Sequence, residues 1–312
     1  TACFRLLKKG GIQVFMFLGL AVAICIIQDA VGSGLAAAFG LNPLLGLCMG
    51  SMPLVGGHGT SGSFGPLLET DYAVVGATTV ALAAATYGLV SGSMMGGPIA
   101  RARVEKLHLK STAAEEGNET AEVMPAVDGQ KFTTSAMFLA VAIGLGTLIF
   151  TFFKDVCHLT FPTYIGAMLA AAAIRNIWDV QNKDLPMVEI DALGGLSLNL
   201  FLSMAMMSLK LWQLAALALP MIVILLVQTV VMFLFANFVV FNVMGRDYEA
   251  AAMTTAFCGF GMGATPNAMA NMRALVERYG AAPRAFFIVP LVGSLFVDFF
   301  NSMILTTFMN FL

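Results

Sequence analysis

The sequence predicts an all-α polytopic membrane protein made of two inverted five-helix repeats, of which the first is incomplete in this chain. The 312-residue chain is 59% hydrophobic and 11% charged, whereas a soluble domain has about 25% charged residues. Apolar stretches of about twenty residues recur, and each is long enough to cross a bilayer as a helix. A glycine-rich pattern also occurs twice, at 56–62 and 259–267.

Long apolar segments predict the membrane helices in chain order. They lie at 11–39, 73–99, 133–153, 160–178, 188–209, 213–243 and 284–309. Two shorter apolar arms, 43–54 and 248–258, lead into the glycine-rich loops, and 64–70 and 267–279 lead out of them. Since glycine and proline interrupt regular helices, each arm, loop and return segment predicts a re-entrant hairpin or a broken helix.

Charged residues gather between the two halves of the chain. Segment 101–131 holds eleven of the 34 charged residues, which are 16 basic and 18 acidic in total. This composition is typical of a solvated linker. The predicted organisation is therefore an N-terminal repeat at 1–100, a linker at 101–131 and a C-terminal repeat at 132–312.

The two glycine patterns superpose with an offset of 204 residues (261 minus 57). This offset also matches the last helix of each half, 73–99 with 284–309. Three predicted helices precede the aligned region in the second half and none does so in the first. Symmetry between repeats therefore predicts about 75 further residues, with roughly three helices, upstream of this chain.

Basic residues predict how the helices are oriented. Arg5, Lys8 and Lys9 precede the first helix, so its start is expected on the cytoplasmic side. Counting crossings from there places the linker in the cytoplasm and the C-terminus outside. The first hairpin then enters from outside and the second from the cytoplasm, which are the opposite orientations that inverted repeats require.

Small and polar residues inside the helices predict contacts between helices. Gly88, Gly92 and Gly96 are spaced four residues apart and indicate close helix packing. Gln228 and Thr229 are adjacent polar residues in an apolar helix. Side chains of this kind are typical of hydrogen bonds between membrane helices.

The glycine loops are the predicted binding site. Open backbone at membrane depth is tolerated where it is buried in protein or lines a cavity, and paired breaks in two halves indicate a transporter's substrate site. Free amides at a half-helix start attract carboxylates, and free carbonyls at a half-helix end attract Na⁺. The predicted substrate-binding residues are Gly56, Gly57, His58, Gly59, Thr60 and Ser61 in the first loop, and Gly261, Gly263, Ala264, Thr265, Pro266 and Asn267 in the second.

Two carboxylates lie inside apolar segments. Asp298 has Asn301 three residues later, on the same face of its helix. A charged residue at mid-membrane costs at least about 2.5–3.5 kcal/mol, so we expect these two oxygen ligands, with Gly59 and Gly263, to hold Na⁺. Asp29, by contrast, is expected in a wet cavity or at headgroup level.

Several functions receive no support from the sequence. The net charge of −2 gives no basic surface for nucleic acid, and the histidines and cysteines are too scattered for a metal site. The chain lacks a G-x-x-x-x-G-K-[ST] motif, so direct coupling to ATP is not expected. Neither paired acids nor a nucleophile constellation indicates an enzyme, and no cofactor other than Na⁺ as coupling ion is predicted.

The chain resembles the bacterial sodium/glutamate symporters from about residue 6 to its end. The resemblance is carried by Gly-Gly-His-Gly-Thr at 56–60, Gly-Phe-Gly-Met-Gly-Ala-Thr-Pro at 259–266, Ala-Met-Ala-Asn-Met at 268–272 and Leu-Lys-Leu-Trp-Gln-Leu at 209–214. It implies a multi-pass protein of the bacterial inner membrane that takes up glutamate with Na⁺. It also implies a homodimer, an elevator-type movement and a site where the two loops meet.

Two alternatives stay open at this point. A related Na⁺-coupled carrier of citrate or another small carboxylate would use similar loops. A channel with paired re-entrant loops is the more distant alternative, although the Thr-Pro-Asn at 265–267 differs from the Asn-Pro-Ala of aquaporin-like channels.

Overall fold

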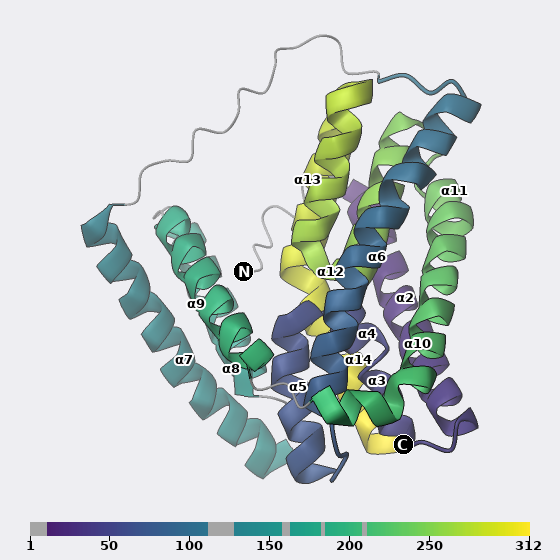
Figure 1. Cartoon of the computed structure of the whole chain (residues 1–312). Helices are drawn as coiled ribbons and strands as arrows, with labels where there is room; N and C mark the ends of the chain where they lie inside the picture. Colours follow the sequence, from purple (N-terminus) through teal and green to yellow (C-terminus); the bar gives the residue numbers. More distant parts are fainter. Residues whose placement is uncertain (1–10, 112–127, 158–162, 182–184, 208–210) are drawn as a thin grey trace. The chain divides into compact units, whose positions relative to one another are not determined.

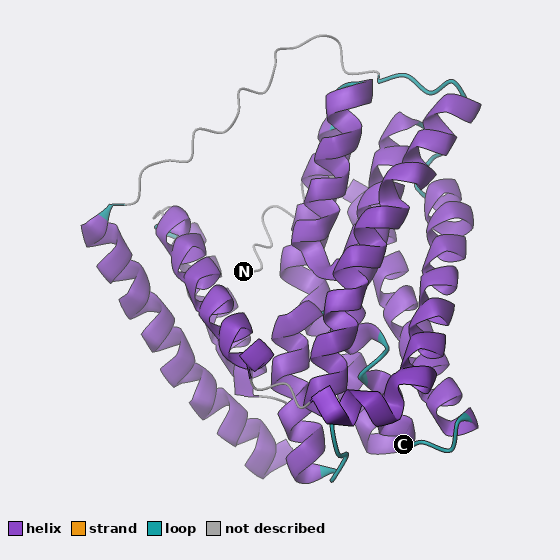
Figure 2. Ribbon diagram, in the orientation of Figure 1, coloured by secondary structure: helices purple, strands orange, loops and turns teal. Residues whose placement is uncertain are grey.

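The computed structural model describes residues 11–111, 128–157, 163–181, 185–207 and 211–312. These residues form helices joined by short loops, and Figure 2 shows no strand among them. The chain divides into two compact units, one containing 129–207 and the other containing 11–111 and 211–312. All-α architecture is thereby confirmed. The basic residues before the first predicted helix and most of the predicted linker lie outside the described residues.

The smaller unit is a group of three helices: α7 (Gly129–Cys157), α8 (Thr163–Val180) and α9 (Met187–Met207). Glycine allows α7 and α8 to touch through their backbones, because a Cβ at Gly166 would lie 2.2 Å from the carbonyl oxygen of Gly146. Phe138 and Trp178 pack edge to face in the same interface, with ring centroids 5.3 Å apart. The three helices match those predicted from apolar segments.

The larger unit contains the two predicted hairpins and the long helices around them (Figure 1). Its elements are α2 (Gly11–Ala38), α3 (Pro43–Leu47), α4 (Ser51–Leu54), α5 (Gly57–Asp71), α6 (Ala77–Lys106), α10 (Leu211–Leu234), η1 (Phe235–Val240), α11 (Phe241–Val243), α12 (Tyr248–Tyr279), α13 (Pro283–Val292), η2 (Gly293–Val297) and α14 (Asp298–Phe311). The two η segments are π-helical turns, which interrupt the predicted helices 213–243 and 284–309. Such turns are frequent at functional sites.

Four of the described helices are long and apolar enough to cross a membrane. They span Gly11–Ala38, Ala77–Lys106, Gly129–Asp155 and Leu217–Val243. Each exceeds the roughly 20 residues that a bilayer core requires. Together with the composition, they make this a membrane protein.

Element α12 is a helical hairpin and not a straight rod. A straight helix of its 32 residues would be about 48 Å long. The Tyr248 hydroxyl nevertheless donates to the Gly280 carbonyl at 2.5 Å. The amide of Asn271 also reaches back to the Thr255 carbonyl at 3.2 Å. The hairpin predicted from the second glycine pattern is thus confirmed, with its two ends side by side.

Helix α6 is longer than predicted, since it continues from residue 99 to Lys106. The extra turns are held by the Arg103 guanidinium, which donates to the Asn237 side chain at 2.7 Å and to its carbonyl at 2.8 Å. The same guanidinium lies 4.7 Å from the centre of the Phe241 ring. Basic residues that the sequence suggested as linker are therefore part of a helix packed on η1 and α11.

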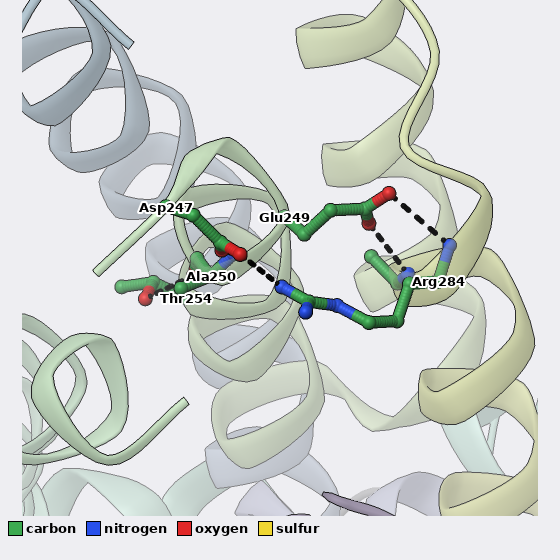
Figure 3. A network of polar contacts seen from close by, with 6 residues as sticks. Asp247, Glu249, Ala250, Thr254 and Arg284 are labelled. Atoms are coloured by element: carbon green, nitrogen blue, oxygen red, sulfur yellow. Dashed lines mark hydrogen bonds and ion pairs between the residues drawn. The ribbon is translucent and has the colours of Figure 1, made fainter. Parts of the chain in front are cut away.

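The base of the α12 hairpin is tied to α13 by a polar network (Figure 3). Asp247 caps α12 by accepting from the Ala250 amide at 2.7 Å, and it accepts from the Arg284 guanidinium at 2.6 Å. Glu249 accepts from the backbone amides of Arg284 and Ala285, at 3.3 and 2.9 Å. These two amides belong to the first turn of α13, which has no helical acceptor for them.

Replacing Glu249 with alanine is expected to lower the free energy of unfolding by about 1–2 kcal/mol, because the start of α13 loses its capping acceptor. Thermal unfolding of the purified protein in detergent measures this. Glu277, exposed on the same hairpin, provides the matched alanine control, and its replacement should change stability by less than about 0.5 kcal/mol. Equal losses in the two variants would contradict the capping role.

Candidate functional site

The first break in the chain is short. Helix α4 ends at Leu54 and α5 begins at Gly57, whose φ of +65° requires the left-handed region that glycine adopts readily. No side chain caps the α5 start at Gly56. The open loop expected at 56–63 is therefore wrong in extent, because α5 already contains most of it.

The early start of α5 satisfies both the serine side chains and the backbone. The hydroxyls of Ser61 and Ser63 donate to the carbonyls of Gly57 and Gly59, at 2.8 and 3.0 Å. Buried backbone groups need partners, and a helix supplies them where an open loop would not. Only the junction itself remains irregular.

The second break lies at the tip of the α12 hairpin. Gly263 and Ala264 have non-helical backbone angles, with φ −160° and ψ 22° for the glycine and φ 66° and ψ 175° for the alanine. Pro266 follows at the start of the return arm, where its missing amide hydrogen costs nothing. Gly259 in the first arm packs directly on Ala268 in the second, since a Cβ there would lie 2.7 Å from the Ala268 nitrogen.

The two breaks meet. A Cβ placed on Gly57 would lie 3.3 Å from the Cβ of Ala264. Two half-helix starts, one on α5 and one on the return arm of α12, thus lie close together. Each start carries backbone amides without helical acceptors, and the helix dipole adds partial positive charge there. This arrangement can bind an anionic group.

Helix α6 supports both breaks through its glycine ridge. A Cβ at Gly88 would lie 2.1 Å from the Met262 carbonyl oxygen and 2.9 Å from Leu54, so this one residue touches both hairpins. A Cβ at Gly92 would lie 3.0 Å from the side-chain nitrogen of Asn267, and a Cβ at Gly96 would lie 2.3 Å from that of Asn271, both in the hairpin. The close packing predicted from the ridge is confirmed.

Several predicted binding residues are engaged by α6. The Asn267 side chain accepts from the Ser93 hydroxyl at 2.5 Å and donates to the Leu89 carbonyl at 3.2 Å. His58 lies 3.1 Å from the Thr86 hydroxyl. These contacts position the tips of the two hairpins, and they use the polar groups that the sequence suggested for a ligand.

The two threonines of the predicted site follow the breaks closely. Thr60 is buried and packs on Gly56, whose Cβ would lie 2.4 Å from its hydroxyl oxygen. Thr265 packs on Gly293, the first residue of the π-helical turn η2, where a Cβ would lie 2.6 Å from the Thr265 hydroxyl. Both hydroxyls therefore lie within one turn of a half-helix start.

A second polar cluster lies at the start of α4, and it contains Asp29. The expectation of a wet position for Asp29 is wrong, because its side chain is 0% exposed. Its carboxylate accepts from the Ser51 amide at 2.7 Å and lies 2.8 Å from the Ser51 hydroxyl. The start of α4 provides these partners, which no spacing rule in the sequence indicates.

Asn301 belongs to the same cluster, whereas Asp298 does not share its hydrogen bonds. The Asn301 side chain lies 2.5 Å from the Ser51 hydroxyl and donates to the Ser51 carbonyl at 3.3 Å. Asp298 is partly buried, and its carboxylate forms no hydrogen bond within the portion of the chain that the structure describes. Of the other residues predicted for Na⁺, Gly59 is exposed and Gly263 is buried at the second break.

Two glutamines connect this cluster to the second break. The Gln28 amide donates to the Gly261 carbonyl at 2.8 Å, and the Gln228 amide donates to the Gln28 carbonyl at 2.7 Å. Thr229 lies 3.0 Å from the Tyr87 hydroxyl. The interhelical bonds predicted for Gln228 and Thr229 are thus confirmed.

Comparisons with known proteins agree with the resemblance seen in the sequence. A family model described as sodium/glutamate symporter matches residues 1–281. The chain is 39% identical over 310 residues to a sodium/glutamate symporter of Escherichia coli (strain K12), covering 97% of this chain and 77% of that protein. It is 35% identical over 314 residues to a sodium/glutamate symporter of Haemophilus influenzae, covering 98% and 77% respectively. No solved structure matches the chain.

Proposed function

Because the chain belongs to the sodium/glutamate symporter family, whose members are transporters and not enzymes, we propose that it carries glutamate into the bacterial cell together with Na⁺. The observation that carries this proposal is the meeting of Gly57 and Ala264 at two half-helix starts. Glutamate has two carboxylates, and each can accept from the free amides of one helix start.

The predicted substrate residues fit such a ligand by their size and chemistry. Glycine lets the backbone approach the substrate closely, while Thr60 and Thr265 add neutral hydroxyls. Since the breaks contain no Lys or Arg, the carboxylates are held by dipoles, which favour release after transport. Citrate or another small carboxylate is the second candidate, because the same amides recognise it.

Coupling to Na⁺ gives the cycle its direction. Moving one negative charge into a negative interior costs about 2.3 kcal/mol per 100 mV. Two or more co-transported Na⁺ ions offset this cost and add the sodium gradient. For Na⁺ ligands, the sequence-based set of Asp298, Asn301, Gly59 and Gly263 stays a prediction.

The finer features implied by the family are also part of the proposal. They are two inverted five-helix repeats, an elevator-type movement, a homodimer, an inner-membrane location, a cytoplasmic linker at 101–131 and a periplasmic C-terminus. The two hairpins support the repeat arrangement, since each follows a long helix and precedes another.

Uptake of labelled glutamate into proteoliposomes tests the function. Saturable uptake that requires an inward Na⁺ gradient and disappears when K⁺ replaces Na⁺ is expected. Unlabelled citrate should compete poorly. Uptake that citrate abolishes would move the substrate to the tricarboxylates, and uptake indifferent to Na⁺ would refute sodium coupling.

Replacing Thr265 with valine is expected to raise the glutamate KM about 10-fold or more, because a hydrogen bond to a charged ligand contributes roughly 1.5–3 kcal/mol. Thr307 is exposed on α14, and its valine variant serves as the matched control with an unchanged KM. A Thr265 variant with the KM of the unmodified protein would remove this hydroxyl from the site.

A further inference from the structure

Three side chains from three separate helices form a buried oxygen cluster. Asp29 comes from α2, Ser51 is the first residue of α4, and Asn301 lies on α14. Their exposed fractions are 0%, 0% and 1%. Asp29 Oδ2 and Asn301 Oδ1 lie 2.8 and 2.5 Å from the same Ser51 hydroxyl oxygen. Two side-chain oxygens from different helices thus converge on a third, the Ser51 hydroxyl.

The cluster lacks one hydrogen. The Ser51 hydroxyl carries a single hydrogen and can donate to only one of the two oxygens beside it. The Asn301 amide nitrogen is directed to the Ser51 carbonyl, so its oxygen is the atom that faces the hydroxyl. Asp29 Oδ1 already accepts from the Ser51 amide. One close oxygen–oxygen contact is therefore left without a hydrogen while Asp29 is ionised.

The cluster also lacks a positive charge. The two salt bridges formed within the described part of the chain are Arg101–Glu105 and Arg284–Asp247, and neither includes Asp29. An ionised carboxylate buried without a counter-charge is strongly unfavourable. A bound cation placed between the three oxygens would supply the charge and relieve the oxygen–oxygen contact.

A fourth oxygen lies on the same face of α2. Ser33 follows Asp29 by four residues, which places it one turn along that face. Its hydroxyl is buried and has no hydrogen-bond partner in the described structure. The backbone approaches closely here, because a Cβ at Gly50 would lie 2.5 Å from Asp29 Oδ1. An unpaired buried oxygen one turn from the carboxylate can supply a further ligand to a hard cation.

We propose that Asp29, Ser51 and Asn301 hold a coupling Na⁺ ion, with the Ser33 hydroxyl as a further ligand. Carboxylate, amide and hydroxyl oxygens are the ligands that hard cations prefer. This inference rests on the proposed function and replaces Asp298 as the charged ligand, while it keeps Asn301. The proposed Na⁺ coupling requires a cation site, and the geometry points to this cluster.

The location explains how Na⁺ is coupled to substrate. Ser51 starts the short helix α4 that leads to the first break, six residues before Gly57. Gln28, the neighbour of Asp29 on α2, donates to the Gly261 carbonyl in the first arm of α12. A cation that fixes α2 against α4 therefore fixes both breaks, and glutamate binds to a prepared site.

The test is Na⁺ binding to the purified full chain without glutamate, followed as the rise in Tm with Na⁺ concentration at constant ionic strength in choline chloride. The unmodified protein should show a saturable rise. Asp29→Asn keeps the shape of the side chain and should lose the rise. Ser51→Ala, which leaves the carboxylate in place, should raise the midpoint Na⁺ concentration about 10-fold or more.

A matched pair on one helix controls for nonspecific effects. Asn301→Leu should abolish the Na⁺ response, whereas Asn310→Leu, at an exposed position on α14, should keep it. If Asp29→Asn does not fold, Ser51→Ala and Asn301→Leu decide the question. The inference is overturned if these variants keep the original midpoint, or if Asp298→Asn abolishes the response while Asp29→Asn retains it.

Failure of this inference and failure of the proposed function give different results. An unmodified protein that binds Na⁺ through Asp29 but transports no glutamate would support the site and refute the substrate. Na⁺-driven glutamate uptake with an unchanged Na⁺ midpoint in Asp29→Asn would support the function and refute the site. An unmodified protein without any Na⁺ response would refute the site, and the uptake assay would then judge the function alone.

Discussion

Gly88→Ala is expected to destabilise the protein by about 3 kcal/mol and to abolish transport. The added Cβ would lie 2.1 Å from the Met262 carbonyl oxygen and 2.9 Å from a Leu54 methyl carbon. A backbone oxygen cannot rotate away as a side chain can, so α6 must separate from the α12 hairpin. Overpacking of this kind typically costs 1–3 kcal/mol, and occasionally more. Thermal unfolding and glutamate uptake measure the two effects.

Gly19→Ala gives the opposite result and serves as the control. Gly19 lies within α2, and a Cβ there meets nothing within 4 Å. Alanine in an open helical position stabilises by about 0.5–1 kcal/mol relative to glycine. If both alanine variants changed stability in the same direction, contact with Met262 could not be the cause at Gly88.

Ala264→Gly is expected to stabilise the protein, and Ala264→Val is expected to destabilise it strongly. Ala264 has φ 66° and ψ 175°, a combination that is essentially restricted to glycine and costs other residues about 1–3 kcal/mol. Ala264→Gly should recover that energy as a higher Tm. Ala264→Val adds a branched side chain beside Gly57, so both the strain and the contact increase.

A second alanine on the same hairpin provides the comparison. Ala270 is exposed and helical, so Ala270→Gly should lower stability by about 1 kcal/mol. The same substitution thus has opposite signs at positions a few residues apart. A lower Tm for Ala264→Gly would show that the hairpin tip has ordinary backbone angles.

Much of the architecture could be predicted from the sequence, because membrane helices are marked by long apolar runs. The helices at 11–39 and 133–153 correspond closely to α2 and α7. The two hairpins were predicted because glycine and proline interrupt apolar runs in two matching places. The backbone breaks at Gly57 and Ala264 lie within these two glycine-rich stretches.

The length of the breaks and the cation cluster could not be predicted. Helical hydrogen bonds satisfy the backbone from Gly57 onward, whereas glycine content alone predicts an open loop. The sequence misplaces Asp29 because its hydrogen-bond partner Ser51 is 22 residues away, and Asn301, which contacts the same Ser51 hydroxyl, is 272 residues away (301 minus 29). A useful local signal was the pair Gln28–Asp29 inside an apolar helix, since two adjacent polar side chains there need two separate partners.

The glycine ridge on α6 also has a genetic consequence. Every missense change in a glycine codon introduces at least a β-carbon. At Gly88, Gly92 and Gly96 that atom would meet the α12 hairpin at 2.1, 2.9 and 2.3 Å. These three codons are therefore expected to be among the most mutation-sensitive in the gene, although none of them encodes a residue with a functional group.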